Sequence, residues 1–348
     1  MVDPVTEVRR RSGTREPRDY GDRSVPLRLS YTSLARRMEC AAAWAYYYAQ
    51  GLPLRDDGGG RFDVGVLTAK IHEVALARFA PLGTVLGEPP PEDEVLGVCS
   101  EIGWTADMPA RPGRQRREDV ERASAAATRL LLALYQHFAG CTVYAIEREI
   151  TWEPAGKPAP FAVYARPDVM LRRPAAGGLV IVDDKTTSRL ASAGRLALDL
   201  QATLYALVTS RTGEAAGLPV EAYQLRTLVP GTTSAKAKPP KPADLAPRLV
   251  CTTPGGPVGP GLAEHQAAVL ASLEAWITSE AVAIRARWHP HVWSTYNTPC
   301  SGCAYADLCD ARVAGDADRV ARVLEYLVPD TSDVALGLAP GDADTAAS

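Results

Sequence analysis

The fold of this chain is decided by GLVIVDDKTT, residues 178–187. Its apolar and mostly β-branched core, LVIV, predicts a buried strand. The strand ends in the charged residues Asp183, Asp184 and Lys185, and charges at the end of a buried strand need partners. Because side chains alternate along a strand, Asp183 and Lys185 share one face and Asp184 lies on the other. The sequence therefore places an acid and an amine together.

The preceding strand, in FAVYARPDVMLRR, carries Asp168. The turn between the two strands is centred near residues 175 and 176, so simple register counting sets Asp168 opposite Asp183, with their Cβ atoms ~5 Å apart. Pro167 can shift this register by one residue through a bulge. Two carboxylates at that distance repel unless they share a proton or a cation. Mg²⁺ or Mn²⁺ suits such oxygen ligands, whereas the alternative is that the charged triplet only forms salt bridges.

The flanking sequence predicts a mixed α/β core. The runs CTVYAIEREITWE and FAVYARPDVMLRR are rich in β-forming residues and, with the decisive stretch, indicate an antiparallel meander. A helix at 196–211 and a strand at 220–229 follow, so the order is sheet, helix, strand. Further elements are expected as a helix at 30–51 capped by Ser30, helices at 64–80, 118–139 and 265–287, a strand at 248–252, a terminal helix ending near Leu327, and a loop-rich stretch at 81–97.

Composition bounds the class of protein. The chain has 348 residues, 46% of them hydrophobic, which is enough for one large domain or two small ones. We expect one domain over 25–329 between disordered tails at 1–24 and 330–348. No run approaches the roughly 20 apolar residues of a membrane helix, and no signal-peptide core is present, so we expect a cytoplasmic protein that does not bind membranes. The net charge of −3 argues against bulk coating of nucleic acid but allows a basic groove.

The seven cysteines include a cluster near the C-terminus. Cys300, Cys303 and Cys309 form a C-x2-C-x5-C pattern, whose short first loop lets two thiolates point at one centre. Three thiolate ligands require a fourth, and Cys40 is the best candidate. Four thiolates are typical of a 4Fe-4S cluster, and soft sulfur ligands also suit zinc. A structural Zn²⁺ site and a set of unpaired cysteines are the alternatives.

Residues spread along the chain carry a resemblance to a known family. They are His72 in AKIHEVA, Asp168 in RPDV, Asp183 and Lys185 in IVDDKTT, and Gln201 and Tyr205 in QATLY, which share one helical face. These motifs resemble those of the PD-(D/E)XK nuclease superfamily, and the helical pair is similar to the Q-x-x-x-Y motif of its RecB-like branch. The resemblance implies a restriction-endonuclease-like core, in which a mixed central β-sheet is flanked by helices.

The resemblance also implies a role for each residue of the charged group. His72, Asp168 and Asp183 would ligate Mg²⁺ or Mn²⁺, and the carbonyl of Asp184 would help. Lys185 would orient the attacking water and offset charge in the transition state.

The remaining motif residues would support the site. Gln201 and Tyr205 would brace it or contact the substrate. Two positions depart from the family pattern, because Thr68 and Ala165 stand where the family usually has glycine. These departures affect how closely the backbone approaches the site and leave the metal chemistry unchanged.

The segment around Cys40, YTSLARRMECAAAWAYYY, resembles the start of the iron-sulfur RecB-like nucleases, which include CRISPR-associated exonucleases and AddB-type recombination nucleases. In those proteins one N-terminal cysteine joins three near the C-terminus, although Ala41 stands here where they usually have proline. The resemblance implies helical N- and C-terminal parts joined by a four-cysteine cluster.

A metal-dependent DNA exonuclease is the function that the resemblance implies, in recombination, repair, phage replication or CRISPR adaptation. Its substrate would be single-stranded DNA or DNA with free ends, and a recombinase, annealing protein or helicase would be its partner. An endonuclease, or a nuclease for branched or RNA substrates, is the alternative among enzymes. The alternative outside enzymes is a catalytically silent DNA-binding scaffold subunit.

Overall fold

The chain forms two compact units. The computed structural model describes residues 26–50, 52, 64–106, 113–155, 160–174, 178–187, 199–212, 220–228, 248–251, 262–288 and 303–327. The sheet unit comprises Arg28–Tyr31 and Gly60–Ser279, and the terminal unit comprises Met1–Leu27, Thr32–Gly59 and Glu280–Ser348. The expectation of one domain over 25–329 stays a prediction, and the expected tails lie outside the described residues.

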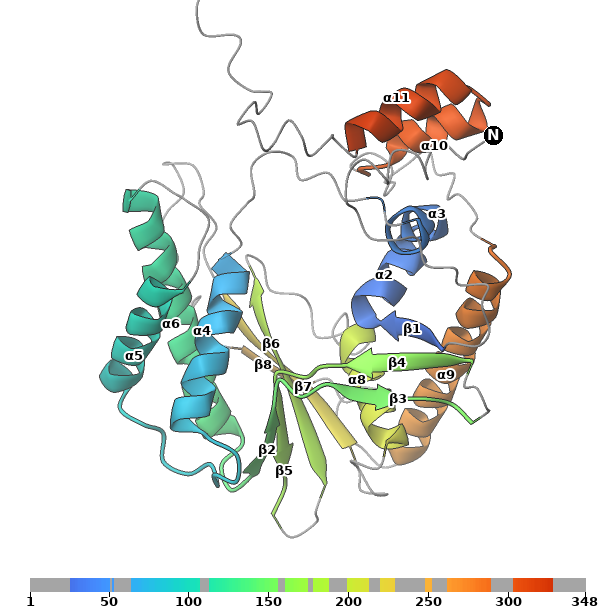
Figure 1. Cartoon of the computed structure of the whole chain (residues 1–348). Coiled ribbons are helices and arrows are strands. Elements are labelled where there is room, and N and C mark those ends of the chain that lie inside the picture. The colour runs from blue at the N-terminus through green and yellow to red at the C-terminus, as the bar shows by residue number, and fades with distance from the viewer. Residues whose placement is uncertain are drawn as a thin grey trace, which may run out of the picture. The chain divides into compact units, whose positions relative to one another are not determined.

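The sheet unit contains a five-stranded and a three-stranded β-sheet (Figure 1). The larger sheet has the order β2 (Thr142–Ile146), β5 (Val169–Arg172), β6 (Leu179–Thr187), β7 (Val220–Leu228) and β8 (Arg248–Cys251), and the smaller has the order β1 (Leu27–Ser30), β4 (Phe161–Ala165) and β3 (Ile150–Trp152). In the larger sheet β6 and β7 run parallel, whereas the other neighbouring pairs are antiparallel. The mixed central sheet expected from the sequence is therefore confirmed.

The expected antiparallel meander is divided between the two sheets. The run 141–153 breaks into β2 and β3 next to Glu147, which has a positive φ of 48°. The run 161–173 breaks into β4 and β5 around Pro167, since proline cannot donate a ladder hydrogen bond. Each run therefore contributes one strand to each sheet, and the expectation of one continuous meander is wrong.

Helices cover both faces of the five-stranded sheet (Figure 1). On one face α4 (Val64–Phe79), α5 (Glu92–Thr105) and α6 (Gly113–His137) pack together, and their core includes Val182 of β6. On the other face α8 (Leu200–Arg211) contacts β6 and β7, and it also contacts β3 and β4. Because side chains alternate along a strand, the even-numbered residues of β6 face α4 and the odd-numbered residues face α8.

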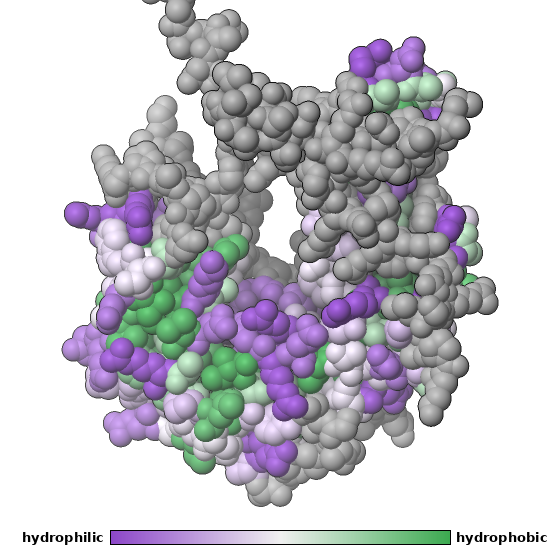
Figure 2. Space-filling model, in the orientation of Figure 1, coloured by the Kyte–Doolittle hydropathy of each residue, from purple (hydrophilic) through white to green (hydrophobic). Residues whose placement is uncertain are grey.

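The surface of the α4–α6 layer is partly apolar. Helix α4 buries Ile71 and His72 but exposes Val66 and Val74, and hydrophobic patches are visible over this layer in Figure 2. Among the described residues, no helix combines the length and the apolar character needed to cross a membrane.

Helix α5 begins inside the stretch that is expected to form a loop. It starts at Glu92, directly after Pro91, and Glu92, Asp93 and Glu94 occupy its first turn. Acidic side chains at that end interact favourably with the helix dipole. The loop prediction for 81–97 is therefore wrong from Glu92 onward.

The packing of α5 against its neighbours requires a glycine at position 103. A Cβ atom at Gly103 would lie 2.9 Å from Cγ1 of Val120 and 3.1 Å from Cδ1 of Ile71, whereas nothing lies within 4 Å of a Cβ atom at Gly97 in the same helix. Both positions gain the same helix propensity on substitution by alanine. We therefore expect Gly103→Ala to be less stable than Gly97→Ala by about 1–3 kcal/mol, the usual cost of overpacking. Urea unfolding measures the difference, and equal stabilities would contradict this packing.

The terminal unit joins segments from near the two ends of the chain. Its elements are most of α2 (Tyr31–Glu39), α3 (Ala41–Trp44), the π-helical turn η1 (Ala45–Ala49), the end of α9 (Leu262–Arg285), α10 (Ala306–Val313) and α11 (Ala317–Leu327). A hydrophobic cluster within this unit includes Tyr46, Leu52, Tyr305 and Leu324. Side chains of the N-terminal segment therefore pack against α10 and α11.

The helix expected at 30–51 is interrupted at Cys40. This residue has an extended backbone, with φ −161° and ψ 114°, and its Sγ accepts a hydrogen bond from Ala43 N at 3.5 Å. Cys40 thus caps α3 instead of continuing α2. Ser30, the expected cap of the whole segment, is the last residue of β1.

Candidate active site at the end of strand β6

The antiparallel pairing of β5 with β6 brings two aspartates together. Val169 pairs with Val182, so Asp168 and Asp183 occupy the next positions along the ladder, as simple counting predicts. The backbone N–H of Asp184 donates a 2.5 Å hydrogen bond to Oδ2 of Asp168. The Asp168 carboxylate is therefore held beside the end of β6.

The odd-numbered face of β6 carries a network around the buried Asp183 side chain. Lys185 Nζ donates to Oδ1 of Asp183 at 3.0 Å and lies 2.9 Å from Oδ2. Gln201 Nε2 donates to the same Oδ1 at 3.0 Å and to the Tyr205 hydroxyl at 2.9 Å. Asp199 caps the N-terminus of α8 and so places Gln201 in the first turn, beside the strand.

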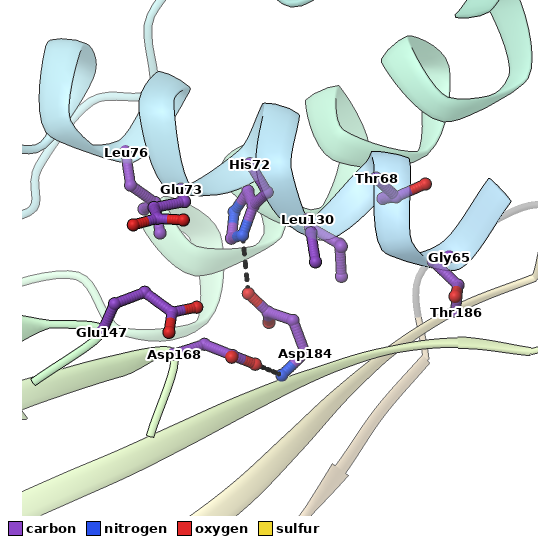
Figure 3. Close-up of a pocket in the computed structure, with 11 residues that line it drawn as sticks. Gly65, Thr68, His72, Glu73, Leu76, Leu130, Glu147, Asp168, Asp184 and Thr186 are labelled. Atoms are coloured by element: carbon purple, nitrogen blue, oxygen red, sulfur yellow. Dashed lines mark hydrogen bonds and ion pairs between the residues drawn. The ribbon is translucent and has the colours of Figure 1, made fainter. Parts of the chain in front are cut away.

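The even-numbered face of β6 opens into a pocket (Figure 3). In this pocket His72 of α4 has its Nδ1 atom 2.7 Å from Oδ2 of Asp184. Asp168, Glu73 and Glu147 also line the pocket. Its cavity volume is about 40 Å³, which is enough to hold a water molecule. The pocket therefore gathers carboxylates around one imidazole.

Burial and repulsion between carboxylates raise the pKa values of Asp168 and Asp183. Burial, followed by the charges of Asp183 and Asp184, raises the pKa of Asp168 well above its usual range. Burial raises the pKa of Asp183 to about 6, although Lys185 opposes this shift. Burial lowers the pKa of Lys185, but Asp183 and Asp168 raise that pKa more strongly, so the amine stays charged. Burial raises the pKa of Tyr205 to about 12, so its hydroxyl is neutral at pH 7.

Buried polar atoms on the pocket side lack hydrogen-bond partners. They are Nε2 of His72 and Oδ1 of Asp184, whose other oxygen, Oδ2, forms the ion pair with His72. An imidazole nitrogen together with carboxylate oxygens suits a divalent ion such as Mn²⁺, and the carboxylates suit Mg²⁺. Within the described ranges, no three His, Cys, Asp or Glu side chains form a ready-made group that could hold a metal ion. His72 and Asp184 instead contact each other directly.

The structure brings the residues singled out by the sequence to the end of β6 and divides them between its two faces. Asp183 contacts Lys185 and Gln201 on the α8 side, whereas His72 contacts the carboxylate of Asp184 on the α4 side. Asp168 lies close to both aspartates of β6. It accepts a hydrogen bond from the backbone of Asp184, and the charges of Asp183 and Asp184 both raise its pKa. Sequence reasoning gave Asp184 a role only through its backbone carbonyl. The structure also places the side chain of Asp184 in the site, next to His72.

Sequence reasoning also missed two acidic residues of the pocket. Glu73 directly follows His72 in α4 and lines the pocket. Its position next to His72 was the sequence signal by which it could have been found. Glu147 belongs to no motif. It reaches the pocket because the chain turns there with a positive φ, and its backbone N–H donates to the carbonyl of Asp168 at 3.0 Å. Arg166 holds the Glu147 carboxylate in a 2.7 Å ion pair.

Part of the predicted cysteine cluster lies in the described residues of the terminal unit. Cys40, Cys303 and Cys309 belong to, or pack against, one hydrophobic cluster. The Cys309 thiol donates to the Tyr46 hydroxyl at 3.8 Å. Cys300 lies outside the described residues. The described cysteines share an apolar environment but do not form a metal-binding group of three or more ligands.

Comparison with known proteins defines the class to which the fold and site belong. The family model of the PD-(D/E)XK nuclease superfamily matches residues 28–310, so this chain belongs to the PD-(D/E)XK nuclease superfamily. No curated protein matches the chain. Among solved structures, the crystal structure of SSO0001 is similar at 12% sequence identity and a TM-score of 0.29, over 70% of this chain and 83% of that chain. A likeness of this size carries no argument about activity.

Proposed function

We propose that this protein is a metal-dependent DNA exonuclease that hydrolyses phosphodiester bonds. The observation that carries the proposal is the meeting of Asp168, Asp183 and Lys185 at the end of β6, in a chain of the PD-(D/E)XK nuclease superfamily. Buried aspartates with raised pKa values beside a charged lysine do not stabilise the fold. Groups with such perturbed pKa values cluster at functional sites.

In this proposal the cation is Mg²⁺ or Mn²⁺, held by His72, Asp168, Asp183 and the carbonyl of Asp184. When bound, such an ion polarises the phosphodiester and lowers the pKa of an attacking water. Lys185 carries a positive charge beside Asp183, where it orients the water and offsets negative charge in the transition state.

Residues of α8 position this lysine and aspartate. Gln201 donates to Asp183 and to Tyr205 at the same time, so it fixes one carboxylate oxygen relative to the helix. The neutral hydroxyl of Tyr205 extends the network and braces the site. DNA with free ends, or single-stranded DNA, is the proposed substrate. A recombinase, an annealing protein or a helicase is the proposed partner.

Lys185→Ala should lower cleavage about a hundredfold to a thousandfold, the usual loss when one group that stabilises transition-state charge is removed. End-labelled linear DNA and circular DNA are incubated with Mg²⁺ or Mn²⁺ and the purified protein. Lys70→Ala, at an exposed lysine of α4, is the matched control and should cleave normally.

The products of this assay separate the competing functions. Loss of label from DNA ends with circles intact supports the exonuclease. Nicking of circles supports an endonuclease instead, and selective cleavage of branched DNA or of RNA supports those substrates. Equal and negligible cleavage by the wild type and Lys185→Ala overturns the nuclease and favours a DNA-binding scaffold.

We also propose that Cys40, Cys300, Cys303 and Cys309 hold a 4Fe-4S cluster, with a structural Zn²⁺ as the alternative. The shared hydrophobic environment of the described cysteines supports this proposal. Because Cys40 lies at the break between α2 and α3 while Cys309 lies in α10, a cluster on these residues would link the N-terminal segment to the C-terminal helices. The sulfur chemistry fits either group.

A further inference from the structure

We propose that Arg28 and Arg166 bind backbone phosphates of a single DNA strand that leads into the pocket. Together with Tyr164 they form one exposed surface at strands β1 and β4, which we call the β4 face. This inference rests on the proposed function, because it concerns the DNA of the same site. It goes beyond that function by assigning the part of the chain along which the substrate strand lies.

Strand β4 and the residues after it turn alternate side chains toward the core and toward solvent. Val163, Ala165 and Pro167 are buried, whereas Tyr164 is partly exposed and Arg166 is exposed. A residue before proline favours an extended backbone, which continues the alternation of the strand as far as Arg166. Tyr164 and Arg166 therefore lie on one side, ~7 Å apart along the chain.

The guanidinium group of Arg166 is held at the rim of the pocket by one of its edges. Its Nε atom donates to the backbone carbonyl of Glu147 at 3.2 Å and lies 2.7 Å from Oε2 of the same residue. Glu147 lines the pocket together with Asp168 (Figure 3). Among the described residues, the two terminal nitrogens of Arg166 have no hydrogen-bond partner, and the side chain is 57% exposed. These nitrogens form an edge that suits two oxygens of a phosphate.

The backbone at Glu147 connects this guanidinium group to the site. Its φ is 48°, a value that is uncommon for a residue other than glycine. Its N–H donates to the carbonyl of Asp168 at 3.0 Å. Such conformations persist where the surroundings enforce them, and they cluster at sites that bind ligands. Glu147 thus links Arg166 to Asp168, which places a phosphate bound by Arg166 next to the proposed cleavage site.

Arg28 of β1 supplies a second guanidinium group on the β4 face. Its Cζ atom lies 4.0 Å from the centre of the Tyr164 ring, so the guanidinium group and the ring are stacked. Its contact with Glu149 is 3.9 Å long, and both side chains are more than half exposed, so this ion pair is weak. Proteins that bind single-stranded nucleic acid combine positive charge and aromatic side chains in the same way.

The charge of the pocket explains why the substrate needs such a surface. Glu73, Glu147, Asp168 and Asp184 line the pocket, and carboxylates repel the phosphates of DNA. The chain as a whole has a net charge of −3, so it does not attract DNA by its overall charge. Attraction therefore requires arginine or lysine side chains concentrated near the site, and the β4 face provides two arginines.

The test measures binding of a labelled single-stranded oligonucleotide by fluorescence anisotropy, in a chelator that prevents cleavage. Arg166→Gln and Arg28→Gln should each make the plot of log affinity against log salt concentration less steep by about 0.7, the contribution of one phosphate contact on a single strand. Because such an effect vanishes near ~1 M salt, each should weaken binding about eightfold at about 50 mM salt and about threefold at about 200 mM. An unchanged slope in either variant would overturn the proposal.

Arg211→Gln is the matched control. Arg211 is also partly exposed and also pairs with one glutamate, Glu274, at 2.7 Å. It lies in the last turn of α8, about 15 Å along the helix from Gln201 at the site. This variant should keep the wild-type slope. An equal loss of slope in Arg211→Gln would show that the loss of any positive charge weakens binding, and the β4 face would then be wrong.

Glu147→Gln separates phosphate binding from a structural role of Arg166. The substitution breaks the ion pair between these residues but leaves the guanidinium charge in place, so the slope should be at least as steep as in the wild type. A slope lowered as in Arg166→Gln would mean that Arg166 acts only by holding Glu147, contrary to the proposal. Arg166→Lys keeps the charge and should restore most of the slope. Circular dichroism checks folding, and Arg166→Met is used if Arg166→Gln does not fold.

The outcomes also separate this inference from the proposed function. If both variants lower the slope but the wild type cleaves no DNA with Mg²⁺ or Mn²⁺, the nuclease is overturned and the β4 face is supported. If the wild type cleaves DNA but the slopes are unchanged, the nuclease is supported and the β4 face is overturned. A wild type that does not bind the oligonucleotide also overturns the β4 face.

Discussion

Asp168→Asn is expected to abolish metal-dependent DNA cleavage and, in the same protein, to raise the melting temperature of the metal-free form. Under the proposed function Asp168 ligates the cation, so cleavage should fall by more than about a hundredfold, the upper end of what loss of an outer-shell partner costs. The stabilisation has a different origin. Asp168 is buried near Asp183 and Asp184, and their repulsion disfavours its charged form.

The pH dependence of this stabilisation follows from the direction of the pKa shift. The unfolded chain releases the proton of an aspartate near pH ~4, whereas the folded, metal-free protein retains the Asp168 proton to a much higher pH because its pKa is raised. Between those two pKa values the folded state binds more protons than the unfolded state, so stability falls as pH rises. Asparagine carries no ionisable proton, and its advantage over aspartate therefore grows as pH rises above ~4.

Thermal melts in the presence of a chelator, from pH 4.5 to pH 8, measure this effect. Asp168→Asn should melt close to the wild type at the acidic end and above it at the alkaline end, where each ~1 kcal/mol corresponds to about 2–4 °C in a domain of this size. Asp93→Asn, at an exposed position in the first turn of α5, is the matched control. It removes a charge that the helix dipole favours, so it should not melt above the wild type at the alkaline end. A variant that melts below the wild type at pH 8 would show that Asp168 stabilises the metal-free fold.

Protein purified without oxygen is expected to be brown and to contain iron and labile sulfide, and Cys303→Ser should lose both. Cys303 is one of the proposed thiolate ligands, and its Sγ accepts a hydrogen bond from Tyr305 N at 3.4 Å. Removal of one of four ligands should release the cluster and destabilise the terminal unit, because binding of a metal group to such a site is coupled to folding.

Iron, sulfide and zinc analyses, with a thermal melt of each protein, check this expectation. Cys99→Ala is the matched control, since Cys99 is buried in the sheet unit and is not a proposed ligand. It should keep its iron. A colourless protein with stoichiometric zinc would replace the iron-sulfur assignment by a structural zinc site. Iron retained in Cys303→Ser would exclude this cysteine as a ligand.

The sequence predicted most of the elements around the site because each depends on local periodicity. Apolar residues at helical spacing identified α4, and the apolar run before Asp183 identified β6. The positions of Asp168 and Asp183 followed from hairpin counting, because the register of two adjacent antiparallel strands depends only on their turn. Val169 pairs with Val182 as that counting requires.

Features that depend on contacts between distant segments could not be predicted in this way. Alternation placed Asp184 opposite Asp183, but it could not show that α4 brings His72 to Asp184 instead of Asp183. The backbone turn at Glu147 left no signal in the sequence, because a residue with positive φ is usually a glycine. Cys40 lies within a run of helix-forming residues, so the break there was equally hidden.

Strand β6 is paired along both edges, antiparallel to β5 and parallel to β7. A one-residue slip would turn every side chain of a strand to the opposite face of its sheet. Asp184 would then meet Gln201, and Asp183 would meet His72. Pairing on two edges therefore protects the identity of the aspartate that each helix reaches.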